Sequence, residues 1–406
     1  MVIKDIPINH DILVWARKQA NLSTERAAQK AKITKIKHGV LAELLTPSLR
    51  LEQWEEGNGS PTYSQLINLA KAYRRPILTF FLSEPPKKEI HILDFRSLGN
   101  KEAEIIGSEA ELSALIRQTE ATQKSVREIL QESNKEPLHF VGSISLQANP
   151  IEVANNIRKT LNYDLTKQSR IRTPDDLFSF IRNKAQEKGI YVIVQGNLGS
   201  HHTNMGPNVF RGFTLSDKIA PFIAINPNDT KTANVFTLAH ELCHLWLGDT
   251  GISNWNSLNI QDFEPSIKNE QFCDQVAAEF LVPKVDLLRD WDLLTIGYEV
   301  DIVIKRIARQ FKLSPIVIAR RLLEFDKISS EDYWEWYNDY HADWLVVKEE
   351  LKKRKKEPPS YKIRTRTRLG TALINTVMDA TREGKISELD ASLILNVKVN
   401  NFIKIM

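Results

Sequence analysis

Two histidines spaced one helical turn apart, with a glutamate directly after the first, constrain this chain more than any other feature. They form the pentapeptide HELCH at residues 240–244, inside the stretch FTLAHELCHLWLGD. On an α-helix, His240 and His244 project from one face, so both imidazoles can reach a single tetrahedral ion. Glu241 points about 100° away around the helix axis, where it can act as a base on a metal-held water. The alternative is a polar stripe on an otherwise apolar helix.

A metal site of this kind needs a third protein ligand, and a second predicted helix offers one. The segment SIKNEQFCDQVAAEFLVP reads as a helix that begins near Ser266 and ends at Pro283. Glu270 and Asp274 lie one turn apart on it. Taken alone, Glu270 would be interpreted as a solvated helix residue. Beside HELCH it is expected to complete a His₂Glu site with an open fourth position, and Asp274 to accept the free N–H of a ligating imidazole.

The two cysteines of the chain, Cys243 and Cys273, lie one in each of these segments. Two thiols cannot form the disulfide framework of a small secreted protein, and they fit a reducing compartment. We expect them to be small buried packing residues, with an oxidant-sensitive thiol as the alternative. No basic stretch leads into an apolar run, and no segment approaches a membrane-spanning length. The sequence therefore predicts a cytoplasmic protein with no membrane partner.

At 406 residues the chain exceeds what one hydrophobic core usually holds, so several folded units are expected. Within the main unit, helices precede three strands, at IYVIVQG, RGFTL and PFIAIN, and the HELCH helix follows them. The predicted class is α+β multidomain. The predicted parts are an all-α domain at 1–86, a helical connector at 87–139, the main unit at 140–345, a basic linker at 346–360 and a small helical region at 361–406.

The stretch from FRGFTL to DTGIS, followed by NEQFCDQVAAEFLVP, resembles the ImmA/IrrE family of metallopeptidases over about residues 140–330. The resemblance implies a zincin-like α+β peptidase domain with thermolysin-type ligation. It implies zinc, with manganese as an option, bound by His240, His244 and Glu270. Glu241 then matches the general base and Asp274 the acid that supports a ligand. Cys243 and Cys273 stand where the family often has glycine or alanine.

Substrate binding and oxyanion stabilisation are less well defined by the sequence. RGFTL or PFIAIN is expected to supply an exposed sheet edge near the metal, to which an extended peptide could add as another strand. An oxyanion partner is also needed. Arg211, His201, His202 and a tyrosine all stay open for this role.

The first 86 residues resemble the Cro/phage-repressor (XRE) type of helix-turn-helix domain, in LVWARKQANLSTERAAQKAKI and RLEQWEEGNGSPTYSQLINLAKAYRR. The resemblance implies that a helix near Pro47 to Glu56 enters the DNA major groove, with Arg50 and Gln53 facing bases. Backbone phosphates would be neutralised by other basic residues. These are Lys30, Lys35, Lys37, Arg74 and Arg75.

Two departures from the helix-turn-helix pattern leave a protein-docking role open. A long segment between Ile33 and Thr46 replaces the usual tight turn. Three glutamates also crowd the expected reading helix, and carboxylates near phosphates oppose DNA binding unless they pair with a cation. They are Glu52, Glu55 and Glu56.

Together these features predict a regulatory zinc endopeptidase that cleaves or inactivates a partner transcriptional repressor, in phage, mobile-element or stress regulation. Its expected partners are a repressor-type protein and DNA, and a homodimer is left open. The alternative is a non-proteolytic DNA-binding regulator or antitoxin-like protein that uses the same fold as a sensor or docking module. The glutamate of HELCH favours the enzyme, because a structural metal site has no use for an adjacent base.

Overall fold

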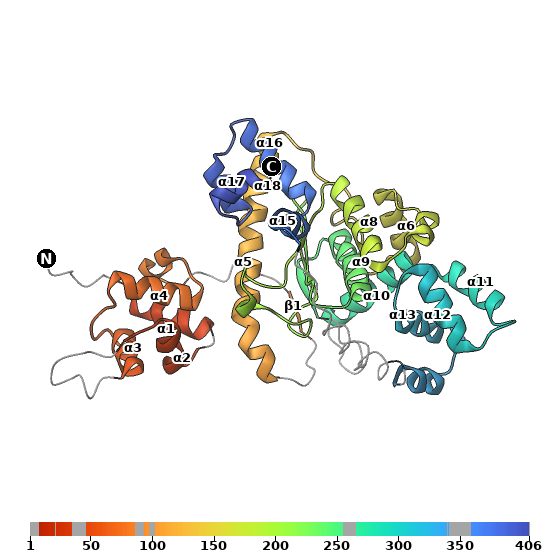
Figure 1. The fold of residues 1–406 in the computed structure, drawn as a ribbon, viewed down its shortest axis with the longest axis horizontal. Coiled ribbons are helices and arrows are strands. Elements are labelled where there is room, and N and C mark those ends of the chain that lie inside the picture. Colours follow the sequence, from red (N-terminus) through yellow and green to blue (C-terminus); the bar gives the residue numbers. More distant parts are fainter. Residues whose placement is uncertain are drawn as a thin grey trace. The chain divides into compact units, whose positions relative to one another are not determined.

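The computed structural model describes residues 8–20, 22–34, 46–85, 93–96, 102–254, 265–338, 340 and 359–405. The chain forms two compact units (Figure 1). Unit 1 draws on residues 1–91, 100–117 and 198–203, and unit 2 on the remainder. Among the described residues, no helix combines the length and the apolar character that crossing a bilayer requires.

Unit 1 is helical, and side-chain oxygens fix where its helices begin. Each of its first four helices has an Asn, Ser or Thr N-cap that accepts a hydrogen bond from a first-turn backbone N–H. The core is apolar, with Ile12, Leu13, Leu51, Leu66 and Phe80 fully buried. The elements are α1 (His10–Gln19), α2 (Thr24–Lys30), α3 (Pro47–Glu55), α4 (Tyr63–Tyr73), η1 (Ile77–Phe81) and the first half of α5 (Glu102–Glu132).

Unit 2 is built on a five-stranded mixed sheet with the order β1-β5-β3-β4-β2. The β3 strand runs antiparallel to both of its neighbours, whereas β2 is parallel to β4 and β1 is parallel to β5. The three expected strands are present, but β1 and β5 were not predicted, and β1 falls within the expected helical connector. The strands are β1 (Leu93–Arg96), β2 (Tyr191–Val194), β3 (Gly212–Leu215), β4 (Phe222–Ile225) and β5 (Gly251–Asn254).

The strand order corrects one expectation about substrate binding. Both RGFTL, which contains β3, and PFIAIN, which contains β4, have a strand on each side. Neither can offer a free edge for an added peptide strand, so the expectation of an exposed edge there was wrong. The edge strands of the sheet are β1 and β2. The β5 strand, which follows the HELCH helix in the sequence, pairs with β3 and so covers the edge that β3 would otherwise expose. Sequence order alone did not reveal that pairing.

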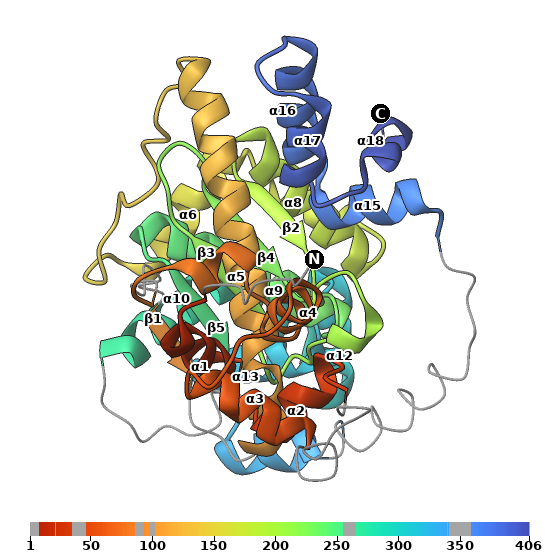
Figure 2. The same cartoon turned by 90° about the vertical axis from the view of Figure 1, so that its left-hand side faces the viewer.

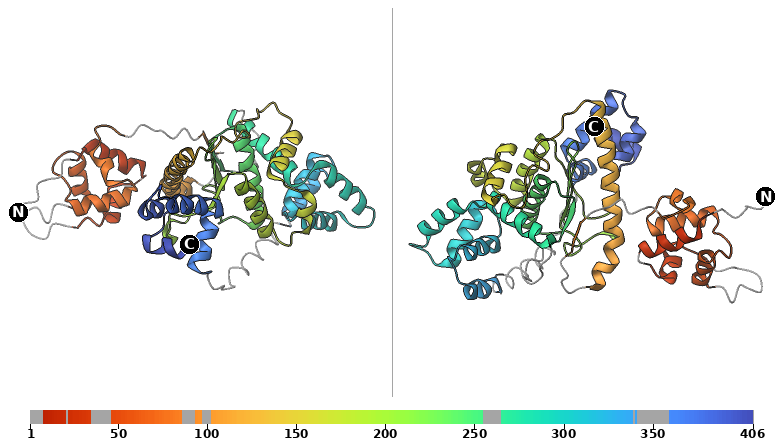
Figure 3. Two further views of the ribbon diagram at one scale, coloured as in Figure 1. Left: turned by 90° about the horizontal axis from the view of Figure 1, so that it is seen from above. Right: turned by 180° about the vertical axis from the view of Figure 1, so that it is seen from behind.

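Helices cover both faces of this sheet (Figure 3). The second half of α5 lies along one face, where Gln123 Nε2 donates to the backbone oxygens of Leu215 and Ala220 at 2.9 and 2.8 Å. The opposite face carries α9 and, beyond it, the remaining helices around one shared apolar core. These are α6 (Pro150–Leu161), α7 (Leu165–Arg170), α8 (Pro174–Glu187), α9 (Lys231–Leu247), α10 (Pro265–Leu281), α11 (Lys284–Leu294), α12 (Val300–Phe311) and α13 (Pro315–Glu324).

The C-terminal helices pack beside the edge strand β2 (Figure 2). Arg182 of α8 donates to Val192 O in β2 and to Thr367 O, which joins α8, β2 and the C-terminal helices. The hydroxyls of Tyr191 and Thr376 lie 3.0 Å apart. These contacts cover the open side of β2. The helices are α15 (Tyr361–Leu369), α16 (Thr371–Arg382), α17 (Glu388–Ile394) and α18 (Val399–Ile405).

Candidate metal and catalytic site

The central helix α9 carries the HELCH pentapeptide and is buried along almost its whole length. Every residue from 234 to 246 is buried, because α9 packs against β3 and β4 on one side and against α8 and α10 on the others. Thr230 caps its start, and its hydroxyl oxygen accepts a hydrogen bond from the backbone N–H of Ala233. Gly248 ends it with φ at 77°, in the left-handed conformation that glycine adopts most readily. The helix is thus a fixed support for its side chains.

Three possible ligand atoms meet between α9 and α10, which lie side by side (Figure 1). Glu270 Oε2 lies 3.2 Å from His240 Nε2, and Glu270 Oε1 lies 3.2 Å from His244 Nε2. The two Nε2 atoms are 3.0 Å apart. A tetrahedral zinc site with bonds of about 2.0 to 2.2 Å places its ligand atoms roughly 3.4 Å apart. The three residues therefore fit one small divalent cation with minor expansion.

The electrostatics of the cluster also favour a positive charge at this point. Burial alone would raise the pKa of Glu270, but the imidazoles of His240 and His244 outweigh it and lower that pKa to about 2. Burial disfavours a protonated His240, yet Glu270 and Asp274 raise its pKa well above the usual value. The carboxylate therefore stays ionised, as metal ligation requires.

Asp274 forms a hydrogen bond with the ring nitrogen of His240 that is not directed at Glu270. Its Oδ1 lies 2.9 Å from His240 Nδ1, the ring nitrogen that points away from Glu270. A carboxylate in this position holds the Nδ1–H tautomer and leaves the lone pair of Nε2 available for a cation. The i, i+4 spacing of Glu270 and Asp274 on α10 thus brings one carboxylate to each nitrogen of the same ring.

The residues of this cluster lie in a segment that matches a known protein family. Residues 185–323 match the IrrE N-terminal-like domain of peptidase family M78. The match runs from within α8 to within α13 and includes His240, His244 and Glu270. It supports a metallopeptidase of the ImmA/IrrE type for this part of the chain. No curated protein and no solved structure matches the sequence.

Glu241 of the IrrE-like segment faces the sheet rather than α10. Its side chain is fully buried, and its Oε2 accepts a 2.6 Å hydrogen bond from the Thr214 hydroxyl in β3. A Cβ atom on Gly212 would lie 2.6 Å from Glu241 Oε1 and 2.8 Å from Thr237 Cγ2. Only a glycine lets β3 approach α9 this closely. Nothing in the sequence around Thr214 or Gly212 pointed to these contacts, because the partners are distant along the chain.

Substituting Thr214 tests whether this hydroxyl positions Glu241. Thr214→Val keeps the shape of the side chain but removes the hydrogen bond, which for a charged partner contributes about 1.5–3 kcal/mol. If Glu241 is the base, we expect kcat to fall about 10-fold or more, with KM and bound metal little changed. Thr214→Ser should retain most activity. Equal losses in the two variants would show that packing, and not the hydroxyl, matters at this position.

Cys243 and Cys273 lie against each other across the α9–α10 contact. Both thiols are fully buried and both are free. Burial, together with the neighbouring Cys243, raises the pKa of Cys273 well above its usual value. A thiol that stays protonated and out of solvent is a poor nucleophile. These observations favour the packing role over the oxidant-sensitive one.

The oxyanion candidates are not brought together by the structure. Arg211 Nε lies 3.5 Å from Asp229 Oδ2, at the start of α9 and about three turns before the histidines. His202 is an exposed residue of η2 (His201–Thr203), which belongs to unit 1. The side chain of His201 lies outside the described residues.

The expected DNA-contacting residues fall on α2 and α3 of unit 1. Arg50 and Gln53 are half-buried on α3, where the Arg50 guanidinium lies 5.2 Å from the centre of the Trp54 ring. Lys30 is exposed at the end of α2. Lys35 and Lys37 lie outside the described residues.

Two of the three glutamates on or beside α3 are engaged within unit 1. Glu55 forms a two-point ion pair with Arg17, with both N–O distances at 2.7 Å. Glu52 accepts a 2.7 Å hydrogen bond from the Thr24 hydroxyl. Glu56 is exposed. Arg17 of α1 thus neutralises the charge of Glu55, which reduces the repulsion between this carboxylate and a DNA phosphate backbone.

Arg74 and Arg75 make contacts within unit 1. Arg74 forms an ion pair with Glu111 of α5. The Arg75 guanidinium lies 4.5 Å from the centre of the Trp15 ring. Both side chains therefore have an internal role beside any contact with phosphates.

Proposed function

We propose that this protein is a regulatory zinc endopeptidase that cleaves or inactivates a partner transcriptional repressor. The observation that supports this most is the cluster of His240, His244 and Glu270, whose ligand atoms lie within 4.8 Å of one another, with the buried Glu241 directly after His240 in the sequence. A purely structural zinc site usually fills all four positions with protein atoms and needs no base beside it. The similarity to peptidase family M78 supports the reaction class. The repressor as substrate follows from the ImmA/IrrE resemblance.

In this mechanism His240, His244 and Glu270 would hold the cation, and Asp274 would fix the tautomer of His240. A zinc ion held there would supply Lewis acidity, which lowers the pKa of a water molecule and polarises the scissile carbonyl. Glu241 takes a proton from the attacking water and passes it to the departing amine, so that two peptides result. Thr214 orients the Glu241 carboxylate through its hydroxyl. Each of these steps uses a side chain whose position is fixed by α9, α10 or β3.

The proposal is tested with the repressor encoded next to this protein's own gene. The two purified proteins are incubated with zinc and the products are identified by mass spectrometry. We expect cleavage that stops with a chelator and in the Glu241→Gln variant. Cleavage that continues in that variant contradicts the mechanism. No cleavage together with intact DNA binding favours the non-proteolytic regulator instead.

We also propose that unit 1 binds DNA through α3. The internal pairing of Glu52 and Glu55 supports this, since it leaves the basic and amide groups of Arg50 and Gln53 with fewer competing charges. Arg50→Ala and Gln53→Ala are each expected to weaken binding to the region upstream of its own gene by about 10-fold, given about 1–3 kcal/mol for a good base contact. Lys135→Ala, an exposed change in unit 2, serves as the control.

Salt titration separates DNA binding from protein docking. If phosphates contribute, the logarithm of the association constant falls linearly with the logarithm of salt concentration. Electrophoretic shifts at several salt concentrations measure this slope. Affinity that does not fall as salt is raised would contradict DNA binding and favour the docking role.

A further inference from the structure

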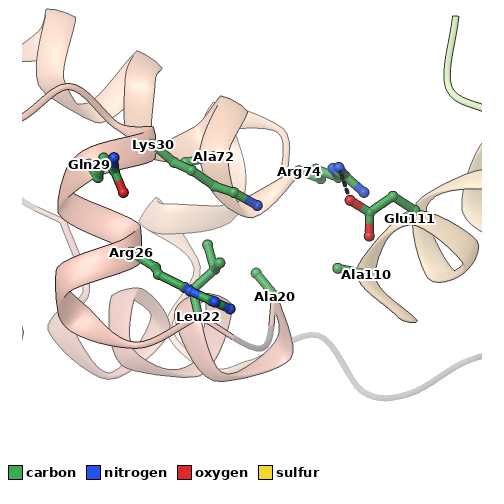
Figure 4. Close-up of a pocket in the computed structure, with 9 residues that line it drawn as sticks. All are labelled: Ala20, Leu22, Arg26, Gln29, Lys30, Ala72, Arg74, Ala110 and Glu111. Atoms are coloured by element: carbon green, nitrogen blue, oxygen red, sulfur yellow. Dashed lines mark hydrogen bonds and ion pairs between the residues drawn. The ribbon is translucent and has the colours of Figure 1, made fainter. Parts of the chain in front are cut away.

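We propose that a cavity inside unit 1 binds a small phosphate-bearing anion. The cavity lies between α2, the C-terminal end of α4 and the first half of α5, and it has a volume of about 210 Å³ (Figure 4). It takes no part in the proposed peptidase chemistry, whose residues all belong to unit 2. Its lining combines an apolar floor of small side chains with a basic rim.

The floor of the cavity is open because its side chains are short. Ala20 follows the end of α1, Ala72 lies on α4 and Ala110 on α5, with Leu22 beside them. Larger side chains at these positions would occupy the space. Figure 4 shows the side chains of Arg26 and Lys30 extending from α2 over this floor. The space is therefore bounded by both an apolar surface and charged groups, as ligand sites usually are.

The rim carries more positive than negative charge. Arg26, Lys30 and Arg74 line the cavity with a single carboxylate, Glu111. Neither Arg26 nor Lys30 has an ion-pair partner among the described residues. Arg26 and Lys30 are exposed, whereas the Arg74 side chain is only 19% exposed. Because removal from water is costly for a cation whose counter-charge is shared, an anion at this point would stabilise Arg74, and the two exposed cations would attract it.

Arg74 has unused hydrogen-bonding capacity at this point. Its Nη2 bonds to Glu111 Oε1, while its Nη1 is buried and has no hydrogen-bond acceptor within the described part of the chain. A buried donor without an acceptor is unfavourable, and a guanidinium offers paired N–H groups that match the oxygens of a phosphate. Arg117 adds further positive charge, since its Nη2 donates to the backbone oxygen of Arg74. An anion with several oxygens satisfies this arrangement better than a chloride ion.

The size of the cavity limits the ligand. Pockets for drug-sized ligands usually measure about 300–1,000 Å³, and this one is smaller. Inorganic phosphate or a short phosphorylated metabolite fits, whereas a dinucleotide does not. A DNA phosphate carries the same chemistry, and Arg26 and Lys30 are exposed, so a duplex is included in the test to distinguish the two sources. The small volume and the buried Nη1 of Arg74 favour a free small anion.

The test is calorimetric titration of the full-length zinc-loaded protein with inorganic phosphate and with 2-phosphoglycolate. Ionic strength is held constant, because screening alone changes charge interactions. We expect saturable binding that weakens about 10-fold or more in Arg26→Gln/Lys30→Gln, since two charged hydrogen-bond donors are removed. The matched control, Lys18→Gln/Lys71→Gln, removes the same charge from exposed positions of α1 and α4 outside the cavity, and should bind normally.

A variant that is expected to tighten anion binding shows that weaker binding in the other variant is not caused by misfolding. Glu111→Gln removes the carboxylate that competes for Arg74, so it should tighten binding severalfold, whereas Glu56→Gln on the exposed end of α3 should not. Circular dichroism and zinc content check that each variant is folded and loaded. The proposal is overturned if the wild-type protein shows no saturable binding. It is overturned as well if Arg26→Gln/Lys30→Gln binds the anion as tightly as the control Lys18→Gln/Lys71→Gln. It is also overturned if Arg26→Gln/Lys30→Gln weakens binding of a DNA duplex alone.

Discussion

Glu241→Gln is expected to keep its zinc and to lose endopeptidase activity by about 10²–10⁴-fold, the range that a general base contributes. The glutamine keeps the shape of the side chain and can still accept from Thr214, but it cannot take up a proton. His240→Ala and Glu270→Ala are expected to lose the zinc itself, because each removes one of three ligand atoms that meet between α9 and α10. Elemental analysis of the purified variants measures the metal, and the repressor-cleavage assay measures activity.

The three variants together distinguish the proposed roles. Asp274→Asn is a useful fourth, since it keeps a hydrogen-bonding group beside His240 Nδ1 and should lower zinc affinity by about 10- to 100-fold without abolishing binding. Equal metal loss in Glu241→Gln and His240→Ala would show that Glu241 is a ligand and not the base. Full zinc content in Glu270→Ala would show that another residue provides the third ligand.

Arg321→Met is expected to destabilise unit 2 by about 3–5 kcal/mol, the cost of leaving a buried charge without its partner. Arg321 of α13 pairs with Glu279 of α10, and both side chains are only 7% exposed. Glu279 also accepts from the backbone N–H of Lys284, at the start of α11. Loss of the guanidinium therefore affects the contact between the metal-bearing helix and the α11–α13 wall. Urea denaturation followed by circular dichroism measures the change.

Arg382→Met provides the matched control for that prediction. Arg382 pairs with Asp379 within α16, and both side chains are 61% exposed. Exposed ion pairs contribute about 0–1 kcal/mol, because water already solvates both charges. A destabilisation in Arg321→Met no greater than in Arg382→Met would mean that Glu279 is solvated or neutral when its partner is missing.

Local patterns predicted three of the strands, but neither β1 and β5 nor the order of the strands in the sheet. All five strands are four residues long. Two of the predicted strands are apolar throughout, YVIV and FIAI, whereas β1 and β5 are the mixed segments LDFR and GISN, which lack a strong pattern. They form strands because they pair with each other and with β3. Pairing partners that are far apart in sequence leave no local signal, so the edge assignment for RGFTL and PFIAIN failed for the same reason.

The sequence alone determined that His240 and His244 share one face of a helix, and that Glu270 and Asp274 share a face of another, because helical periodicity depends only on neighbouring residues. The tertiary structure decided what meets these faces. Packing of α10 on α9 brings the carboxylate of Glu270 to 3.2 Å from each imidazole, and the approach of β3 to α9 brings Thr214 to Glu241. Such contacts form only when the helices and strands pack together, because they join side chains that are far apart in the sequence.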